Sequence, residues 1–198
     1  MIHPDTKVEY INDTIGYGLV ATKFIPRGTI TWVLDELDAV YSPEKVSSLS
    51  QLLQKQLEIY SFRNAAGEKI LCWDNAKFVN HSFYPTCFST AYDLEIAIRD
   101  IHPGEQLTDD YGYLNVETPF FPVDEGHARK AVYPNDLLNF HEEWDELIKN
   151  NLPFVFSQEQ PLLPYVDTDL WNDFKKLEKD PSQMQSLLSC HHYNKIAV

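Results

Sequence analysis

Short stretches in which apolar and polar residues alternate dominate the first half of the chain, and this pattern predicts β-strands. The stretches are rich in β-branched and aromatic residues and are bounded by turn residues, which favours strands over 8–11, 18–24, 29–34, 69–73, 87–92 and 94–98. Between the second and third of these, Pro26 and Gly28 have the spacing of a type I turn, so we expect a hairpin there. Pro103 and Gly104 occupy the second and third positions of a type II turn.

A different pattern, with apolar residues three and four positions apart, predicts helices in other parts of the chain. One helix is expected over 43–57, with Ser42 as its N-cap and Pro43 in its first turn. Beyond a proline-rich connector at 117–135, helices are expected over 137–148, from a Thr168 or Asp169 cap to about 180, and briefly up to 188. Because isolated helices of this length are marginal in water, we expect this tail to pack back on the β-rich part.

The 198-residue chain therefore divides into a β-rich part, 1–118, with a helical insert at about 43–60, and a part at 119–198 that holds the connector and a helical extension. Hydrophobic residues make up 43% of the chain, which is enough for a folded core. No run of about 18 apolar residues predicts a membrane span, and the first residues lack the pattern of a signal peptide. Cytoplasmic location is the default expectation, with nuclear action, delivery into a host cell and the oligomeric state left open.

The charge balance is strongly acidic, with 16 Lys and Arg against 30 Asp and Glu and a net charge of −14. Direct nucleic-acid binding is disfavoured, because such surfaces are normally basic. An acidic surface favours cationic partners such as Lys/Arg-rich proteins, although the charge also serves simply to keep a protein soluble. The three cysteines, Cys72, Cys87 and Cys190, form neither a disulfide framework nor a CxxC zinc pair, and we expect no metal site.

Several short motifs suggest chemistry, but each is ambiguous alone. Gly16-Tyr17-Gly18 lacks the third glycine and the following helix of a dinucleotide-binding loop, so its glycines serve either a tight hairpin or a ligand that lies against the main chain. Asn80-His81-Ser82 is by itself a loop with side-chain capping. Asp109 and Asp110 are adjacent on an expected strand and point to opposite faces, which argues against one metal shared by both.

Taken together and in order, the motifs resemble the SET-domain family, which contains protein lysine methyltransferases that use S-adenosylmethionine. The resemblance spans roughly residues 7–113. It rests on Gly16-x-Gly18-Leu19-Val20-Ala21, Ile25-Pro26-Arg27-Gly28, Phe78-Val79-Asn80-His81-Ser82-x-x-Pro85 and Ile101-x-x-Gly104-Glu105-x-Leu107-Thr108-x-Asp110-Tyr111. It implies a mainly β fold with α-helices, in which small curved β-sheets form a pseudoknot, followed here by the helical C-terminal extension.

The resemblance also implies a cofactor site for S-adenosylmethionine, with S-adenosylhomocysteine as the product. By matching positions, Tyr111 is the catalytic tyrosine and also lies at the cofactor. The residues that would meet the cofactor's methionine part through main-chain groups are Gly16, Tyr17, Gly18 and Leu19. Asn80 and His81 would hold its amino group and its adenine edge. Many members close this site with a cysteine-rich zinc segment, but 114–135 contains no cysteine, so we expect Phe120 or Phe121 to stack on the adenine.

A narrow substrate channel is a further implication, and we assign Tyr60, Asp109 and Tyr113 to it. Position 109 is often Phe or Tyr in the family, where it influences how many methyl groups are added, so a carboxylate at this position is a departure that would attract a cationic substrate. The expected function is methylation of lysine side chains in a basic protein, such as a histone-like or ribosomal one. The alternatives are a catalytically silent module that binds a protein partner and a methyltransferase with another kind of acceptor.

Overall fold

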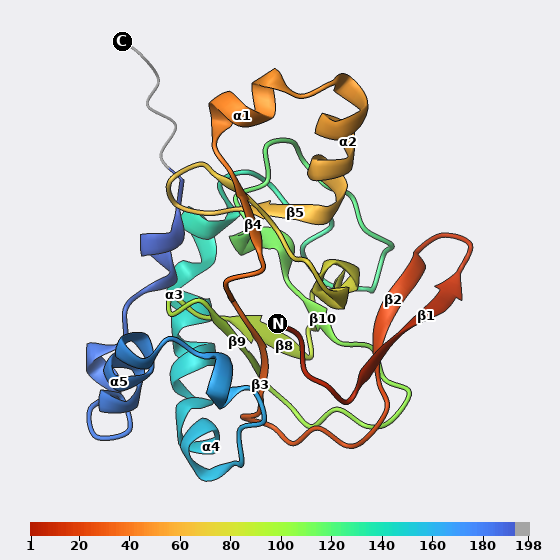
Figure 1. Cartoon of the computed structure of the whole chain (residues 1–198). Coiled ribbons are helices and arrows are strands. Elements are labelled where there is room, and N and C mark those ends of the chain that lie inside the picture. Colours follow the sequence, from red (N-terminus) through yellow and green to blue (C-terminus); the bar gives the residue numbers. More distant parts are fainter. Residues whose placement is uncertain (193–198) are drawn as a thin grey trace.

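A hairpin projects from one side of the molecule in the computed structural model, which describes residues 1–192 (Figure 1). Its strands are β1 (Thr6–Asn12) and β2 (Gly16–Ala21), which pair antiparallel. The Asn12 side chain accepts hydrogen bonds from the backbone N–H groups of Thr14 and Ile15, both at 2.9 Å, and Gly16 has a φ of +79°. The glycines of the Gly16–Gly18 motif therefore do serve a tight hairpin, which is one of the two roles expected for them.

Three more small sheets form the body behind this hairpin. One has the order β3 (Ile30–Val33), β9 (Leu94–Ala97), β8 (Cys87–Ser89), and another has the order β4 (Ala39–Tyr41), β6 (Lys69–Leu71), β5 (Ser61–Arg63). Both are antiparallel. The smallest sheet is a parallel pair of two-residue strands, β7 (Asn80–His81) and β10 (Thr108–Asp109). This architecture confirms the predicted fold class of small sheets with helices and a helical C-terminal region.

The expected hairpin around Pro26 and Gly28 is wrong, because β3 pairs with β9 and not with β2. The turn covers Pro26–Thr29, where the Thr29 N–H donates to the Pro26 carbonyl at 3.1 Å and Gly28 sits third with a φ of +88°. A left-handed residue at the third position is the requirement of a type II turn. The Gly28 N–H donates to the Ala97 carbonyl at 2.8 Å, so this turn carries the chain from one sheet to the next.

The predicted insert is helical, but it forms two helices instead of one: α1 (Pro43–Ser48) and α2 (Gln51–Tyr60). Ser42 caps the first as expected, since its hydroxyl accepts from the Lys45 N–H at 3.2 Å. Leu49 then becomes extended with a ψ of 158°, and Ser50 starts the second helix as a new N-cap. Only Leu57 of the two helices is buried, so the insert is largely exposed.

The tail contains the predicted helices and one more. They are α3 (Asp136–Lys149), α4 (Leu152–Ser157) and α5 (Thr168–Lys176), and short 3₁₀ turns follow up to Cys190. The segment at 150–153, expected only to end the first helix, also starts α4, because Pro153 suits the first turn of a helix. The cap of α5 is Asp167, one residue before the predicted positions, and its carboxylate accepts from the N–H groups of Asp169 and Leu170.

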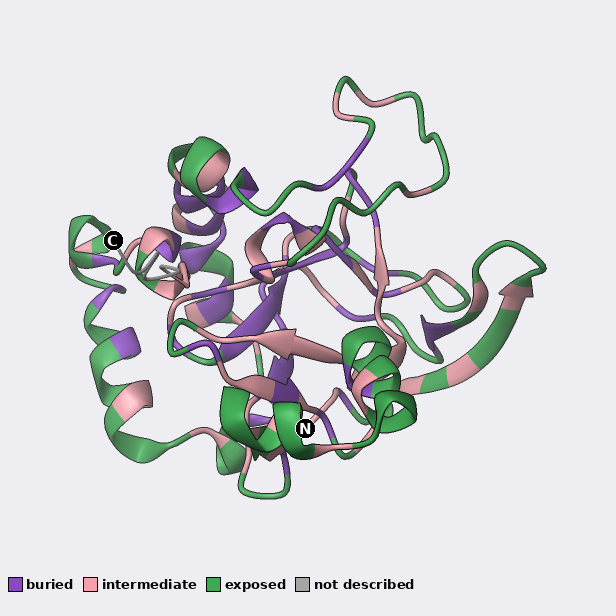
Figure 2. Ribbon diagram, turned by 90° about the horizontal axis from the view of Figure 1, so that it is seen from above, coloured by how far each residue is buried: buried purple, intermediate pink, exposed green. Residues whose placement is uncertain are grey.

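The largest hydrophobic core is built jointly by the β-rich part and the tail, which confirms that the tail packs back. Fully buried side chains from the β3–β9–β8 sheet, such as Ile30, Phe88 and Ile96, belong to the same cluster as Leu137 of α3 and Phe174 of α5. In Figure 2 the buried segments gather in the centre and the exposed ones at the rim. The division of the chain into two parts at residue 118 stays a prediction. Both parts contribute residues to this core. Within residues 1–192, every helix is too short or too polar to cross a lipid bilayer.

Candidate active site

The parallel pairing of β7 with β10 brings two distant motifs together. Thr108 lies opposite Asn80, and Asp109 lies opposite His81. Just beyond β10, the Tyr111 N–H donates to His81 Nδ1 at 3.1 Å, and the Tyr111 hydroxyl donates to the Val79 carbonyl at 2.7 Å. The sequence motifs around residues 80 and 111 therefore form one site, as the family resemblance predicts.

The hairpin approaches this site through Gly18. The Asn80 side-chain amide donates to the Tyr17 carbonyl and to the Gln106 side chain, both at 3.1 Å. A Cβ on Gly18 would lie 2.7 Å from the Asn80 amide nitrogen and 2.5 Å from the Gln106 side-chain oxygen. Position 18 thus requires glycine because the Asn80 and Gln106 side chains lie too close for a Cβ, whereas position 16 requires glycine because its φ is positive.

A cavity of about 1200 Å³ joins most of the predicted site residues. Those that line it are Gly16, Tyr17, Tyr60, Asn80, His81, Asp109, Tyr111, Tyr113, Phe120 and Phe121. Gly18 and Leu19 are the exceptions. The Leu19 side chain is fully buried in a second hydrophobic core, and its carbonyl accepts from the Leu107 N–H at 2.8 Å.

His81 is a neutral side chain with one unused polar atom. Burial lowers its pKa to about 4, since desolvation disfavours the charged imidazolium. Its Nδ1 accepts from the Tyr111 N–H, which assigns the ring proton to Nε2. That Nε2 is buried and has no hydrogen-bond partner among residues 1–192. A buried donor of this kind normally has a partner, so it marks a position for an acceptor group.

Tyr111 is equally buried, and burial raises the pKa of its hydroxyl. The neutral hydroxyl donates to Val79, which leaves its oxygen lone pairs free to accept. The Phe120 ring lies beside both neighbours, with its centroid 5.7 Å from those of His81 and Tyr111. Both phenylalanines predicted at the cofactor line the cavity; Phe120 also contacts the His81 and Tyr111 rings, while Phe121 is 70% exposed.

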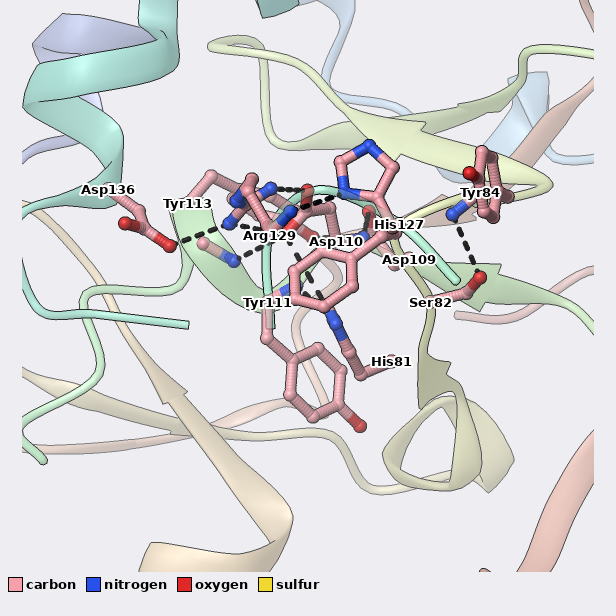
Figure 3. Close-up of polar contacts among 12 residues, drawn as sticks. His81, Ser82, Tyr84, Asp109, Asp110, Tyr111, Tyr113, His127, Arg129 and Asp136 are labelled. Atoms are coloured by element: carbon pink, nitrogen blue, oxygen red, sulfur yellow. Dashed lines mark hydrogen bonds and ion pairs between the residues drawn. The ribbon is translucent and has the colours of Figure 1, made fainter. Parts of the chain in front are cut away.

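Arg129 is a site residue that sequence reasoning missed. Its guanidinium forms ion pairs with Asp110 and Asp136, as Figure 3 shows, and lies over the rings of Phe83 and Phe140 at 4.7 and 4.6 Å. Both aspartates are buried, and the Asp110 side chain also accepts from the Gly112 N–H at 2.9 Å. The connector is therefore fastened to the segment that carries the tyrosine.

Glu125 fastens the same connector to the other motif. One carboxylate oxygen accepts from the Ser82 hydroxyl and the other from the Phe83 N–H, both at 2.8 Å. The His127 ring stacks on Phe83 with centroids 5.2 Å apart. A pair of backbone hydrogen bonds between Phe120 and Val132, at 2.9 and 2.8 Å, closes the base of the connector. Single charged residues in a proline-rich stretch carry no periodic signal, which is why sequence reasoning did not single them out.

A buried acidic pair lines the deep part of the cavity. Asp109 was predicted in the substrate channel, but its partner Glu95 was missed. The two side chains share a hydrogen bond, and burial raises the pKa of both, most strongly that of Asp109. The Tyr113 hydroxyl bonds to Asp109 and lies 2.6 Å from the Ser89 hydroxyl. The sequence signal for Glu95 is that a charged residue stands among apolar residues on a central strand.

Comparison with protein families finds a match for about half of the chain. Residues 16–112 match the family model of the SET domain. No curated protein sequence matches the chain. Among solved structures, the chain is similar to the methyltransferase domain of human histone-lysine N-methyltransferase SETMAR, with 22% identity and a TM-score of 0.39. The match covers 59% of this chain and 47% of the other, so this chain spans about half the length of that structure.

Proposed function

We propose, on the premise that residues 16–112 of this chain belong to the SET-domain family, that the protein transfers a methyl group from S-adenosylmethionine to a lysine side chain of a protein substrate. One observation carries the proposal: the β7–β10 pairing brings Asn80, His81 and Tyr111 together at the wall of one large cavity. Those are the positions that the family resemblance assigns to the cofactor and to catalysis.

The residues present fit that cofactor. The unpartnered His81 Nε2–H supplies a buried donor, and the absent side chain at Gly18 lets the hairpin pack directly against Asn80, which holds that residue at the cavity wall. Backbone groups of Gly16 and Tyr17, which line the cavity, would meet the methionine part, and the Phe120 ring would stack on the adenine. When bound, the cofactor supplies a methyl group that its sulfonium already activates.

The chain's own contribution to the reaction is then positioning. The incoming lysine must be neutral to attack, while its pKa in water is near 10.4, and burial in the cavity lowers that pKa. The Tyr111 hydroxyl oxygen and the Val79 carbonyl lie side by side, 2.7 Å apart, and would orient the amine toward the methyl group. Alignment of reactants is a large source of rate enhancement, on the order of several kcal/mol.

A basic protein is the proposed substrate. The net charge of −14 favours a partner rich in lysine and arginine, because opposite charges increase the rate of encounter. Tyr60 and Tyr113 line the cavity and would form walls of the channel that receives the lysine.

Calorimetric titration with S-adenosylhomocysteine tests the proposal directly. We expect saturable one-to-one binding by the wild-type protein and at least about tenfold weaker binding by Asn80→Ala, which loses contacts to the hairpin and to the cofactor. Tyr111→Phe is expected to keep binding and to lose transfer of labelled methyl groups to purified core histones. Absence of binding up to millimolar concentrations would refute the proposal and favour a silent module that binds a protein partner.

A further inference from the structure

We propose that the carboxyl pair of Glu95 and Asp109 accepts the proton that a primary ammonium group must lose inside the cavity. The inference rests on the proposed function and adds to it a proton acceptor and a substrate class, a primary amine that arrives protonated. It concerns two buried titratable groups that play no part in the positioning of the amine by Tyr111.

The two carboxyl groups come from different sheets and meet at the cavity wall. Glu95 lies on β9 and is 4% exposed, and Asp109 lies on β10 and is 3% exposed. Thr31 donates to Glu95 at 2.6 Å, and Tyr113 donates to Asp109, so both groups are held in place. Each carboxyl oxygen has two lone pairs, and these contacts leave acceptor positions unused.

Among residues 1–192, the pair has no cation of its own. None of the ion pairs that residues 1–192 form involves Glu95 or Asp109. The titratable groups that face the pair are Cys72, Cys87, Asp110, Tyr111 and Tyr113, of which Asp110 is paired with Arg129. A buried carboxylate without a counter-charge is costly, so the pair retains a proton or takes up a cation from outside.

A second observation points to a ligand at the same place. Trp32 lies opposite Glu95 in the β3–β9 register and lines the same cavity. Its indole N–H is buried and has no hydrogen-bond partner within residues 1–192. Indole N–H groups normally find an acceptor when they are buried. A ligand in this cavity can therefore accept a hydrogen bond from Trp32, whereas an ammonium group, which only donates, would use the acidic pair.

The proton step follows from desolvation of both partners. Burial disfavours the charged form of an amine and of a carboxylate alike, so the proton moves from nitrogen to oxygen. One N–H bond of the ammonium breaks and its electron pair stays on nitrogen, while an O–H bond forms on the one carboxylate of the pair, whose other member already holds the shared proton. The neutral amine then holds the lone pair that attacks the methyl group, and the pair keeps the proton without help from solvent.

The test follows n-butylamine, which has the length of a lysine side chain, as it binds to protein saturated with S-adenosylhomocysteine at about pH 8. The free amine is protonated there, because its pKa resembles that of lysine, near 10.4. Infrared difference spectroscopy detects conversion of a carboxylate to a carboxylic acid. We expect one carboxyl group protonated for each amine bound by the wild-type protein, and no proton released to the solvent.

Asp109→Asn and Glu95→Gln are expected to remove this infrared signal and to weaken amine binding at least about tenfold. Glu105→Gln is the matched control, because Glu105 lies at the exposed turn after Gly104, and it should keep the signal. Circular dichroism confirms that each variant is folded, and two independent variants keep the test valid if one of them unfolds.

The outcomes separate this inference from the proposed function. If the wild-type protein fails to bind S-adenosylhomocysteine, both are overturned. If it binds S-adenosylhomocysteine but fails to bind the amine, or binds it without the carboxyl signal, only the acceptor role is overturned. Persistence of the signal in both Asp109→Asn and Glu95→Gln would also overturn it.

Discussion

Replacement of Arg129 by Met should destabilise the fold more than the replacement of any other single charged residue in the connector. Arg129 forms ion pairs with two buried carboxylates, Asp110 and Asp136, which are 3% and 2% exposed. Removal of one partner from a buried ion pair costs about 3–5 kcal/mol, because the remaining charge is uncompensated. Loss of the contacts over Phe83 and Phe140 adds about 0.5–1 kcal/mol each. A domain of this size is stable by only about 5–15 kcal/mol, so the variant should be close to unfolding.

Urea denaturation followed by circular dichroism measures this loss, and Lys130→Ala is the matched control. The Lys130 ion pair with Asp124 is exposed on both sides, so its removal should cost less than about 1 kcal/mol. Arg129→Met combined with Asp110→Asn and Asp136→Asn should recover most of the stability, since no buried charge is then unpaired.

The same variant should also become more stable in acid. Burial raises the pKa of Asp110 even with Arg129 present, and loss of the arginine raises it further. A carboxyl group whose pKa is higher in the folded state stabilises the fold below its unfolded pKa, and this contribution is lost as the pH rises through the folded value. Arg129→Met should therefore gain stability from about pH 7 to 5. A loss as small as that of Lys130→Ala, or no recovery in the triple variant, would refute the argument.

Three further predictions concern the site itself. Glu125→Ala should weaken S-adenosylhomocysteine binding about tenfold in calorimetry, because it frees the connector from the segment after β7. Asp124→Ala should leave the affinity unchanged, since within residues 1–192 Asp124 bonds only to groups of the connector, and equal effects of the two variants would contradict the role of Glu125. Gly18→Ala should lower the same affinity while the protein stays folded, because the new Cβ displaces the Asn80 side chain, and unaltered binding would show that this contact is unimportant. The pKa of His81, measured by NMR titration, should be about 4, below its value of about 6.5 in the unfolded chain. Its contribution to stability is therefore fully present above pH about 6.5 and is lost as the pH falls toward 4. In His81→Gln, the loss of stability on acidification should be smaller.

Features that depend on local patterns could be predicted from the sequence. The helix α3 follows from apolar spacing, because it buries one stripe against the core, and β1 follows from its largely alternating half-buried and exposed residues. The strands β3 and β9 are buried at all four positions and follow from short runs of mostly apolar residues. The proximity of His81 to Tyr111 follows only from the family resemblance, since residues 30 apart carry no local signal of contact.

Features that depend on distant partners could not be predicted. The apolar spacing from Val46 to Leu57 continues through Leu49, so nothing in the pattern shows that the helix breaks there and restarts at Ser50. Strands of two or three residues, such as β5 and β7, are too short for a periodicity to be seen. The roles of Glu95 and Arg129 depend on which buried groups surround them, and those groups come from several elements.

The tail is part of the support of the candidate site and not a separate appendage. Asp136 at the start of α3 binds Arg129, which in turn binds Asp110, the residue before the catalytic candidate Tyr111. On the same helix, Trp144 packs so closely on Gly112 that a Cβ there would lie 2.7 Å from the indole. Because α3 shares its hydrophobic core with the β3–β9–β8 sheet, the position of the tyrosine is fixed from two sides. A chain that has no cysteine in 114–135 thereby holds the end of the segment that matches the SET-domain model in place with a buried arginine and a helix.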